Sequence, residues 1–111
     1  MNKKDVNVAS YAAWAESKLG PSKCKSIVIV NQSKMLYGWY DWKGTIYLNI
    51  KWCKSKATLY RVLAHEWTHA QQRYSKYKKL MEIYGYSEHP LEIEARRRER
   101  TCHSANYVQT P

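Results

Sequence analysis

The pattern of apolar and polar positions predicts a helix at the start of the chain. Apolar residues recur at intervals of three or four from Val8 to Leu19, which is the spacing of one helix face. Asp5 or Asn7 is suited to cap this helix, and Gly20-Pro21 is suited to end it. We therefore expect a packing helix over the first fifth of the chain.

The next segments have the pattern of strands. Residues 26–31 form a short run rich in β-branched side chains, and residues 36–42 are rich in aromatic ones. From Ile46 to Trp52 every second residue is apolar, as in a strand whose two faces meet different environments. The sequence Asp41-Trp42-Lys43-Gly44 precedes this strand and has turn chemistry. We expect three strands.

Two longer helices should follow. Residues 56–77 contain neither glycine nor proline, and their apolar side chains spread around more than one helix face, which predicts a largely buried helix. Residues 90–107 form the last predicted helix, with Pro90 in its first turn. The order of one helix, three strands and two helices predicts an α+β fold in which a small sheet packs on the helices. We expect residues 1–111 to form a single domain, because a chain of this length has room for one core.

Composition adds a prediction about the cellular compartment. The three cysteines, Cys24, Cys53 and Cys102, contain no CxxC pair, so a disulfide framework or a zinc ribbon built from cysteines is not expected. No apolar stretch has the length of a membrane span or of a signal peptide. We therefore expect a cytoplasmic protein that does not contact the membrane.

The strongest chemical signal is the sequence His65-Glu66-Trp67-Thr68-His69 within the helix predicted for residues 56–77. Residues four apart lie on one face of a helix, so both imidazoles can bind one metal ion. Two imidazoles and a carboxylate suit a tetrahedral Zn²⁺ site with one position open for water. Glu66 is close enough to that position to act as general base.

This HExxH motif, with a strand before it and a glutamate-bearing helix after it, resembles the active site of gluzincin-type zincins, a family of zinc metallopeptidases. The resemblance covers residues 45–102. It implies a third zinc ligand on the last helix, where Glu94-Ala95 matches the family pattern best. Glu92 is the second choice for this ligand and His89 the third.

The resemblance also has departures and further implications. The metzincin subclass is not expected, because the residues after His69 lack its glycine and histidine. Related enzymes have an aspartate four residues after the ligand glutamate, but this chain has Arg98 there. Another group, such as Glu99 or Glu92, must then orient the zinc histidines. In the family, the strand corresponding to residues 45–52 is an edge strand that pairs with the substrate.

The sequence thus predicts a zinc metallopeptidase that hydrolyses an amide bond of a peptide or protein with water activated by zinc. A second hypothesis follows from the formal net charge of +10. Such a charge favours anionic partners, so the chain could instead be a basic nucleic-acid-associated protein with a structural or catalytically silent zinc site. The basic residues cluster at Lys76, Lys78, Lys79, Arg96, Arg97, Arg98 and Arg100. The oligomeric state has no signature in the sequence.

Overall fold

A computed structural model describes the backbone of residues 8–105 and the side chains of residues 8–101. Within this range the chain forms four helices and a three-stranded mixed sheet, which confirms the predicted α+β class. The elements are α1 (Val8–Leu19), β1 (Ser26–Val30), β2 (Gly38–Tyr40), β3 (Thr45–Asn49), α2 (Lys56–Ala70), α3 (Tyr74–Tyr84) and α4 (Pro90–Ala105). The expected caps Asp5 and Asn7, and the end of the last predicted helix, lie outside the described residues.

The strand with the clearest alternating pattern, β3, lies in the middle of the sheet. It pairs in parallel with β1 and antiparallel with β2, so the strand order is β1-β3-β2. Ile46 and Leu48 of β3 are fully buried, as their alternation predicted. The expectation that this segment is an edge strand was wrong, because alternation reports the two faces of a strand and not its neighbours in the sheet. The two edge strands are β1 and β2.

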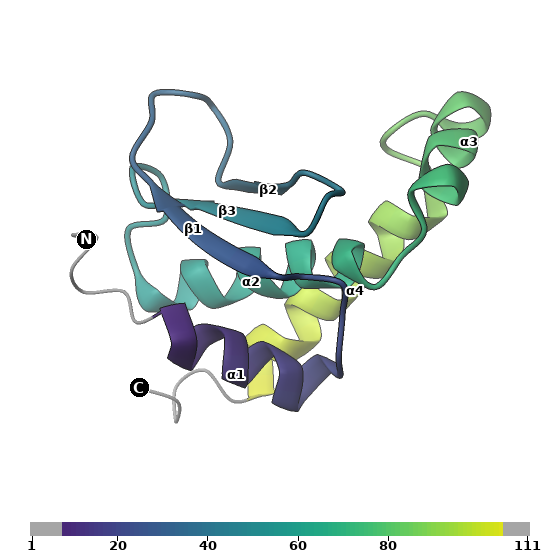
Figure 1. Ribbon diagram of the computed structural model, residues 1–111. Coiled ribbons are helices and arrows are strands. Elements are labelled where there is room, and N and C mark those ends of the chain that lie inside the picture. The colour runs from purple at the N-terminus through teal and green to yellow at the C-terminus, as the bar shows by residue number, and fades with distance from the viewer. Residues whose placement is uncertain (1–7, 106–111) are drawn as a thin grey trace.

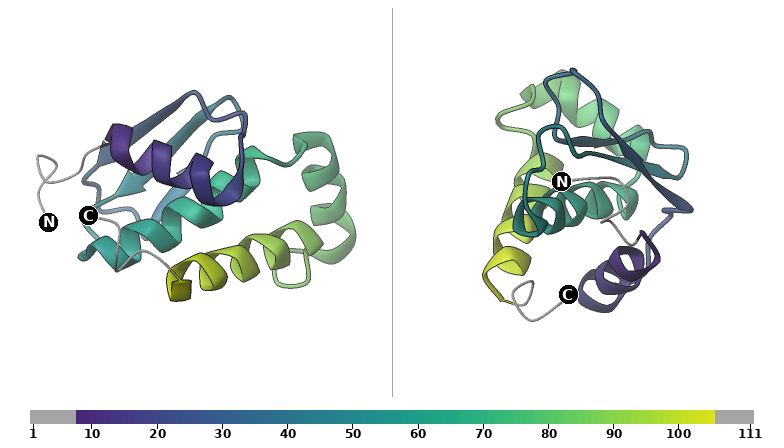
Figure 2. Two further views of the ribbon diagram at one scale, coloured as in Figure 1. Left: turned by 90° about the horizontal axis from the view of Figure 1, so that it is seen from below. Right: turned by 90° about the vertical axis from the view of Figure 1, so that its left-hand side faces the viewer.

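The core lies between the sheet and two helices. Helices α1 and α2 cover one face of the sheet, and α4 runs beside α2 on the side away from α1 (Figures 1 and 2). Apolar side chains from the sheet, α1 and α2 fill the space between them, among them Tyr11, Trp14, Ile46, Leu48, Leu59, Tyr60 and Leu63. Helix α3, by contrast, buries none of its residues and extends away from the sheet (Figure 1).

The single helix predicted for residues 56–77 is two helices, α2 and α3. The break needs neither glycine nor proline, because other parts of the chain bind the end of α2. The carbonyl of Ala70 accepts a hydrogen bond from the amide of Lys23 at 3.0 Å, and the side chain of Gln71 donates to the carbonyl of Leu19 at 2.7 Å. The predicted helix was therefore too long, because these contacts come from a distant segment.

The expected compartment was based on the cysteines and on the apolar character of the helices. Cys24 is half-buried and Cys53 is buried, and both are free thiols; the side chain of Cys102 lies outside the described residues. None of the helices in residues 8–105 combines the length and the apolar character needed to cross a membrane.

Candidate metal centre

Helix α2 presents the two histidines of the HExxH motif side by side. Ser55 begins the helix with an extended backbone, and its hydroxyl accepts a hydrogen bond from the amide of Thr58 at 3.2 Å, as helix-capping serines do. From this start, the four-residue spacing places His65 and His69 one turn apart, with ring centroids separated by 5.0 Å. Their side chains are 14% and 6% exposed, so the pair is largely shielded from water.

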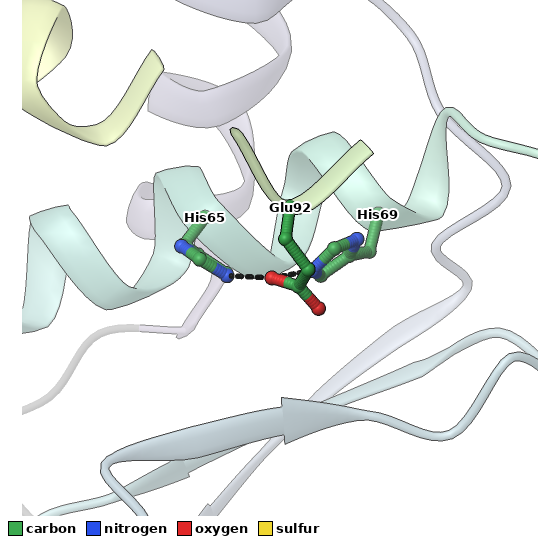
Figure 3. A group of neighbouring side chains, drawn as sticks. All are labelled: His65, His69 and Glu92. Carbon is green, nitrogen blue, oxygen red and sulfur yellow. Dashed lines mark hydrogen bonds and ion pairs between the residues drawn. The ribbon is translucent and has the colours of Figure 1, made fainter. Parts of the chain in front are cut away.

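Helix α4 brings a carboxylate between the two imidazoles (Figure 3). Oε1 of Glu92 lies 3.1 Å from Nε2 of His65 and 3.2 Å from Nε2 of His69. The next turn of α4 has Ala95, which is completely buried; a side chain this small allows α4 to approach α2 closely. One ligand atom from each of His65, His69 and Glu92 lies within 4.8 Å of the other two, so the group could hold a metal ion.

The outer nitrogen of each ring has its own acceptor. Nδ1 of His65 donates to Oε1 of Glu99 at 2.6 Å, and Nδ1 of His69 donates to Oε1 of Gln72 at 2.7 Å. The side-chain nitrogen of Gln72 donates to Glu94 at 2.8 Å, so its oxygen is free to accept. Contacts of this kind fix the tautomer of a metal-binding histidine. They leave both Nε2 atoms facing Glu92.

Tyr77, from α3, completes the surroundings of Glu92. Its hydroxyl donates a hydrogen bond to Oε2, the carboxylate oxygen that faces neither histidine. Partial burial and the Glu92 carboxylate hold the pKa of Tyr77 far above its ordinary value, so the hydroxyl keeps its proton and remains a donor. Tyr77 was not among the candidates from the sequence, because ten tyrosines gave no reason to select it.

The charges of the group are strongly coupled. Burial opposes ionisation of Glu92, yet its contacts with His65, His69 and the hydroxyl of Tyr77 hold its pKa well below the ordinary range. Burial also opposes protonation of His65, but its hydrogen bonds to Glu92 and Glu99 raise its pKa to about 10. Such a pKa favours the protonated ring at neutral pH. A metal ion would take the place of the proton on Nε2.

Glu66 lies beside this group, and Glu66 and the group line one hollow. The hollow is bordered by β2, α2, α3 and α4, and Glu66 lines it together with both histidines, Glu92 and Tyr86. Burial raises the pKa of Glu66, and the neighbouring histidines partly offset this effect. A carboxylate with a raised pKa next to a metal group is suited to accept and return a proton.

Trp42 forms another wall of the hollow. Asp41 accepts hydrogen bonds from the amides of Lys43 and Thr45, which closes the turn before β3. Trp42 adopts the left-handed backbone conformation in this turn, with φ of 64°, which is uncommon for a residue with a large side chain. Its ring lies 5.5 Å from the ring of His69 and 4.7 Å from that of Tyr77.

The structure separates the three carboxylate and imidazole candidates for the third ligand. Glu94, the first choice from the sequence, is not in the group, because its carboxylate binds Gln72 instead. His89 is completely buried but caps α4: Nδ1 accepts from the amide of Leu91, and Nε2 donates to the carbonyl of Tyr77. Among the residues that the structure describes, the group that could hold a metal ion is therefore His65, His69 and Glu92, the second choice from the sequence for the third member.

The donor atoms fit a zinc ion. The group offers two imidazole nitrogens and one carboxylate oxygen within 4.8 Å of one another, which are the donor types of a three-ligand zinc site that keeps a fourth position for water. Imidazole and carboxylate are common zinc donors, and the outer hydrogen bonds suit such ligands. Comparisons of the chain with protein-family models, with curated proteins and with solved structures found no match.

Proposed function

We propose that this chain is a zinc-dependent peptidase of the gluzincin type, in which His65, His69 and Glu92 hold zinc and Glu66 is the general base. The observation that carries the proposal is the convergence of these residues in one hollow below the free edge of β2. A site that only stabilised the fold would gain nothing from a carboxylate such as Glu66 beside an open position.

The edge of β2 is suited to bind an extended peptide. The amide of Asn49 donates to the carbonyl of Tyr37, and the amide of Asp41 donates to the carbonyl of Thr45. Because hydrogen-bonded positions alternate in an antiparallel pair, Gly38 and Tyr40 direct their amides and carbonyls away from β3. A peptide strand added at this edge would pass over the metal group.

The reaction we propose is the hydrolysis of an amide bond. Zinc, when bound, would supply a Lewis acid that polarises the carbonyl and lowers the pKa of water. Glu66 would accept the proton of the attacking water and transfer it to the leaving amine. Tyr77 would hold Glu92 through its second oxygen, and Glu99 and Gln72 would hold the two imidazoles, so the site needs little rearrangement.

A second candidate function is nucleic-acid binding with a silent zinc site. The specific observation that favours it is the surface of α3, where Lys76, Lys78 and Lys79 are exposed beside the half-exposed Tyr74 and Tyr84. Lysines can bind phosphates and tyrosines can stack on bases. In that case Glu66 would have no role in the function.

The test compares zinc content and hydrolysis of an unstructured protein such as casein in wild type and three variants. Wild type should bind about one zinc per chain and cleave. Glu66→Gln should keep the zinc and lose about 10²- to 10⁴-fold in rate, the usual contribution of a general base. Glu92→Gln should bind zinc more weakly than the matched control Glu94→Gln. Wild type that takes up no zinc, or Glu66→Gln that cleaves like wild type, would contradict the proposal.

A further inference from the structure

The hollow lined by His65, His69, Glu92 and Glu66, called the metal hollow below, is one end of a longer cleft along α2. A second hollow shares Gly38, His65, Glu66 and Tyr86 with it, and a third shares Tyr37, Val62 and Glu99 with the second. The α2 residues of this cleft follow one helix face from His69 through His65 and Val62 to Thr58, at intervals of three or four residues. A bound peptide would therefore meet three chemically different surfaces in order.

The part next to the metal group combines large apolar side chains with the polar groups of His65, Glu66 and Glu99. Its walls include Met35, Leu36 and Tyr37 from the loop before β2, and Tyr86 from the segment after α3. These four large side chains are between 47% and 83% exposed, and exposed apolar side chains gathered around one hollow indicate a binding site. The hollow of about 250 Å³ is smaller than sites for drug-sized ligands, and it suits one apolar side chain.

The loop that forms this wall is held in place by a buried polar side chain. Asn49 is fully buried, and its amide nitrogen donates to the carbonyls of Gln32 and Leu36 at 3.0 Å each. Its oxygen accepts from the amide of Gln32, also at 3.0 Å. Trp52 donates to the carbonyl of Lys34 from the other side. The apolar hollow is therefore built before any ligand binds.

The far end of the cleft is cationic. The third hollow is lined by Lys54, Arg61, Thr58, Trp52 and Tyr37, with Glu99 at its border to the second. Oε1 of Glu99 is hydrogen-bonded to His65, and Oε2 lies 3.7 Å from Arg61. In this hollow the single carboxylate of Glu99 lies among two cationic side chains, Arg61 and Lys54, and the first turn of α2 contains no acidic residue. The excess positive charge favours an anionic group.

Antiparallel pairing with β2, the slightly more stable arrangement of two strands, would set the direction of a bound peptide. Strand β2 runs from Gly38, which borders both the apolar hollow and the metal hollow, to Tyr40, which borders only the metal hollow. A peptide added antiparallel to β2 would place the residues after the scissile bond toward Gly38 and Tyr37. On α2, Val62 and Arg61 lie about 7 and 9 Å, and Thr58 about 13 Å, from the midpoint of the two histidines. An extended chain covers these distances in about two to four residues.

We propose, on the basis of the peptidase function above, that the cleft selects substrates with an apolar side chain one or two residues after the scissile bond and a carboxylate three or four residues after it. Arg61 and Lys54 bind the carboxylate, and Met35, Leu36 and Tyr86 enclose the apolar side chain. The carboxylate belongs either to an Asp or Glu side chain or to the C-terminus of the peptide, since both present the same anionic group.

The experiment uses zinc-loaded full-length protein and a peptide library whose cleavage sites are identified by mass spectrometry. Synthetic peptides based on the best site then differ only at the carboxylate position, with Glu, Gln or Lys, and with an acid or an amide at the C-terminus. We expect kcat/KM to be about tenfold higher for Glu than for Gln, or for the acid than for the amide, and lowest for Lys. The pair that shows the difference identifies the source of the carboxylate.

Two variants of the cationic end and one control complete the test. Arg61→Gln and Lys54→Glu should each bring the ratio of kcat/KM for the two peptides toward one, and Arg97→Glu, an exposed α4 residue outside the cleft, should leave it unchanged. The ratio does not depend on the fraction of folded enzyme. A ratio near one in wild type, or a ratio unaffected by both variants, overturns the inference and leaves the peptidase function intact.

Two other outcomes distinguish the alternatives. The absence of cleavage of any peptide by zinc-loaded protein would overturn the proposed function and, with it, this inference. The cationic end could instead bind a single-stranded oligonucleotide, with both Arg61→Gln and Lys54→Glu weakening that binding. Together with a ratio near one for the two peptides, this result would assign the cationic end to nucleic acid and would also overturn the inference about substrates.

Discussion

At the scale of single residues, Glu92 and Glu94 illustrate how two similar side chains acquire different roles. Successive helix residues are rotated by about 100°, so positions two apart point about 200° apart around α4. Glu92 therefore reaches between His65 and His69, and Glu94 reaches Gln72. The spacing of Glu92, Ala95 and Glu99 follows one helix face, a signal in the sequence that could have pointed to Glu92, although the family pattern favoured Glu94.

Glu99 provides a prediction at this scale. Its hydrogen bond holds the ring of His65, and loss of such a contact typically lowers metal affinity 10- to 100-fold. We expect Glu99→Gln to lower zinc affinity by about this factor, because the neutral amide is a weaker acceptor. Competition with a chromophoric chelator would measure the affinity.

The control is Glu82→Gln, which removes the same charge from an exposed position on α3 and should leave zinc affinity unchanged. Equal affinities for Glu99→Gln and wild type would show that the His65 ring is held without this carboxylate.

At the scale of elements, the close approach of β2 to α2 depends on one glycine. A Cβ atom at Gly38 would lie 2.6 Å from a methyl group of Val62 and 2.7 Å from the carbonyl oxygen of Tyr47. Both distances are far shorter than ordinary contacts, and the carbonyl belongs to the paired strand β3, so it cannot move aside easily. Any larger residue must therefore displace β2, which borders the metal hollow.

We expect Gly38→Ala to destabilise the protein by about 1–3 kcal/mol, as overpacked sites do, and to lower kcat/KM by up to about a hundredfold, because small displacements of binding elements are costly in catalysis. Denaturant unfolding and peptide cleavage would measure the two effects. Adding Val62→Ala should recover part of the stability, since it removes one of the two clashes.

Gly85→Ala is the matched control. Gly85 has a φ of +71° and a ψ of −171°, a backbone region that is essentially restricted to glycine, but no neighbouring atom near its missing Cβ, so alanine should cost about 1–3 kcal/mol through backbone strain alone. We expect it to leave kcat/KM unchanged. If Gly38→Ala also left kcat/KM unchanged, β2 would not be the strand that positions the substrate.

At the scale of the whole molecule, the candidate site joins the closely packed helices α2 and α4 to α3, which makes few contacts with the other elements. Two ligands come from α2 and one from α4, and the hydroxyl of Tyr77 connects α3, which buries no residue of its own. A metal ion bound only by the folded state would stabilise this arrangement. Its removal should therefore affect the stability of the entire protein.

We expect zinc at a hundred times its dissociation constant to add about 2.7 kcal/mol to the free energy of unfolding, which raises Tm by roughly 10–20 °C in a domain of this size. Scanning calorimetry with zinc and with a chelator would measure the shift. The same treatments should give equal Tm values for His65→Ala. A wild-type Tm that does not respond to the chelator would argue against a metal ion in the folded protein.

Local patterns in the sequence were sufficient to predict part of the fold and part of the candidate site. The α+β class, the first helix, the alternating faces of β3 and the placement of His65 and His69 on one helix face all depend on spacing along the chain. Spacing is set by the fixed geometry of helices and strands, so these features could be predicted without knowing what packs against them.

Other features were decided by contacts between distant segments. The end of α2 depends on Lys23 and Leu19, the middle position of β3 depends on its two neighbours, and the choice of Glu92 over Glu94 depends on how α4 is rotated against α2. A sequence pattern reports which face of an element is buried, but it does not report the partner. The candidate metal group therefore combines a local motif with a third member that tertiary packing selects.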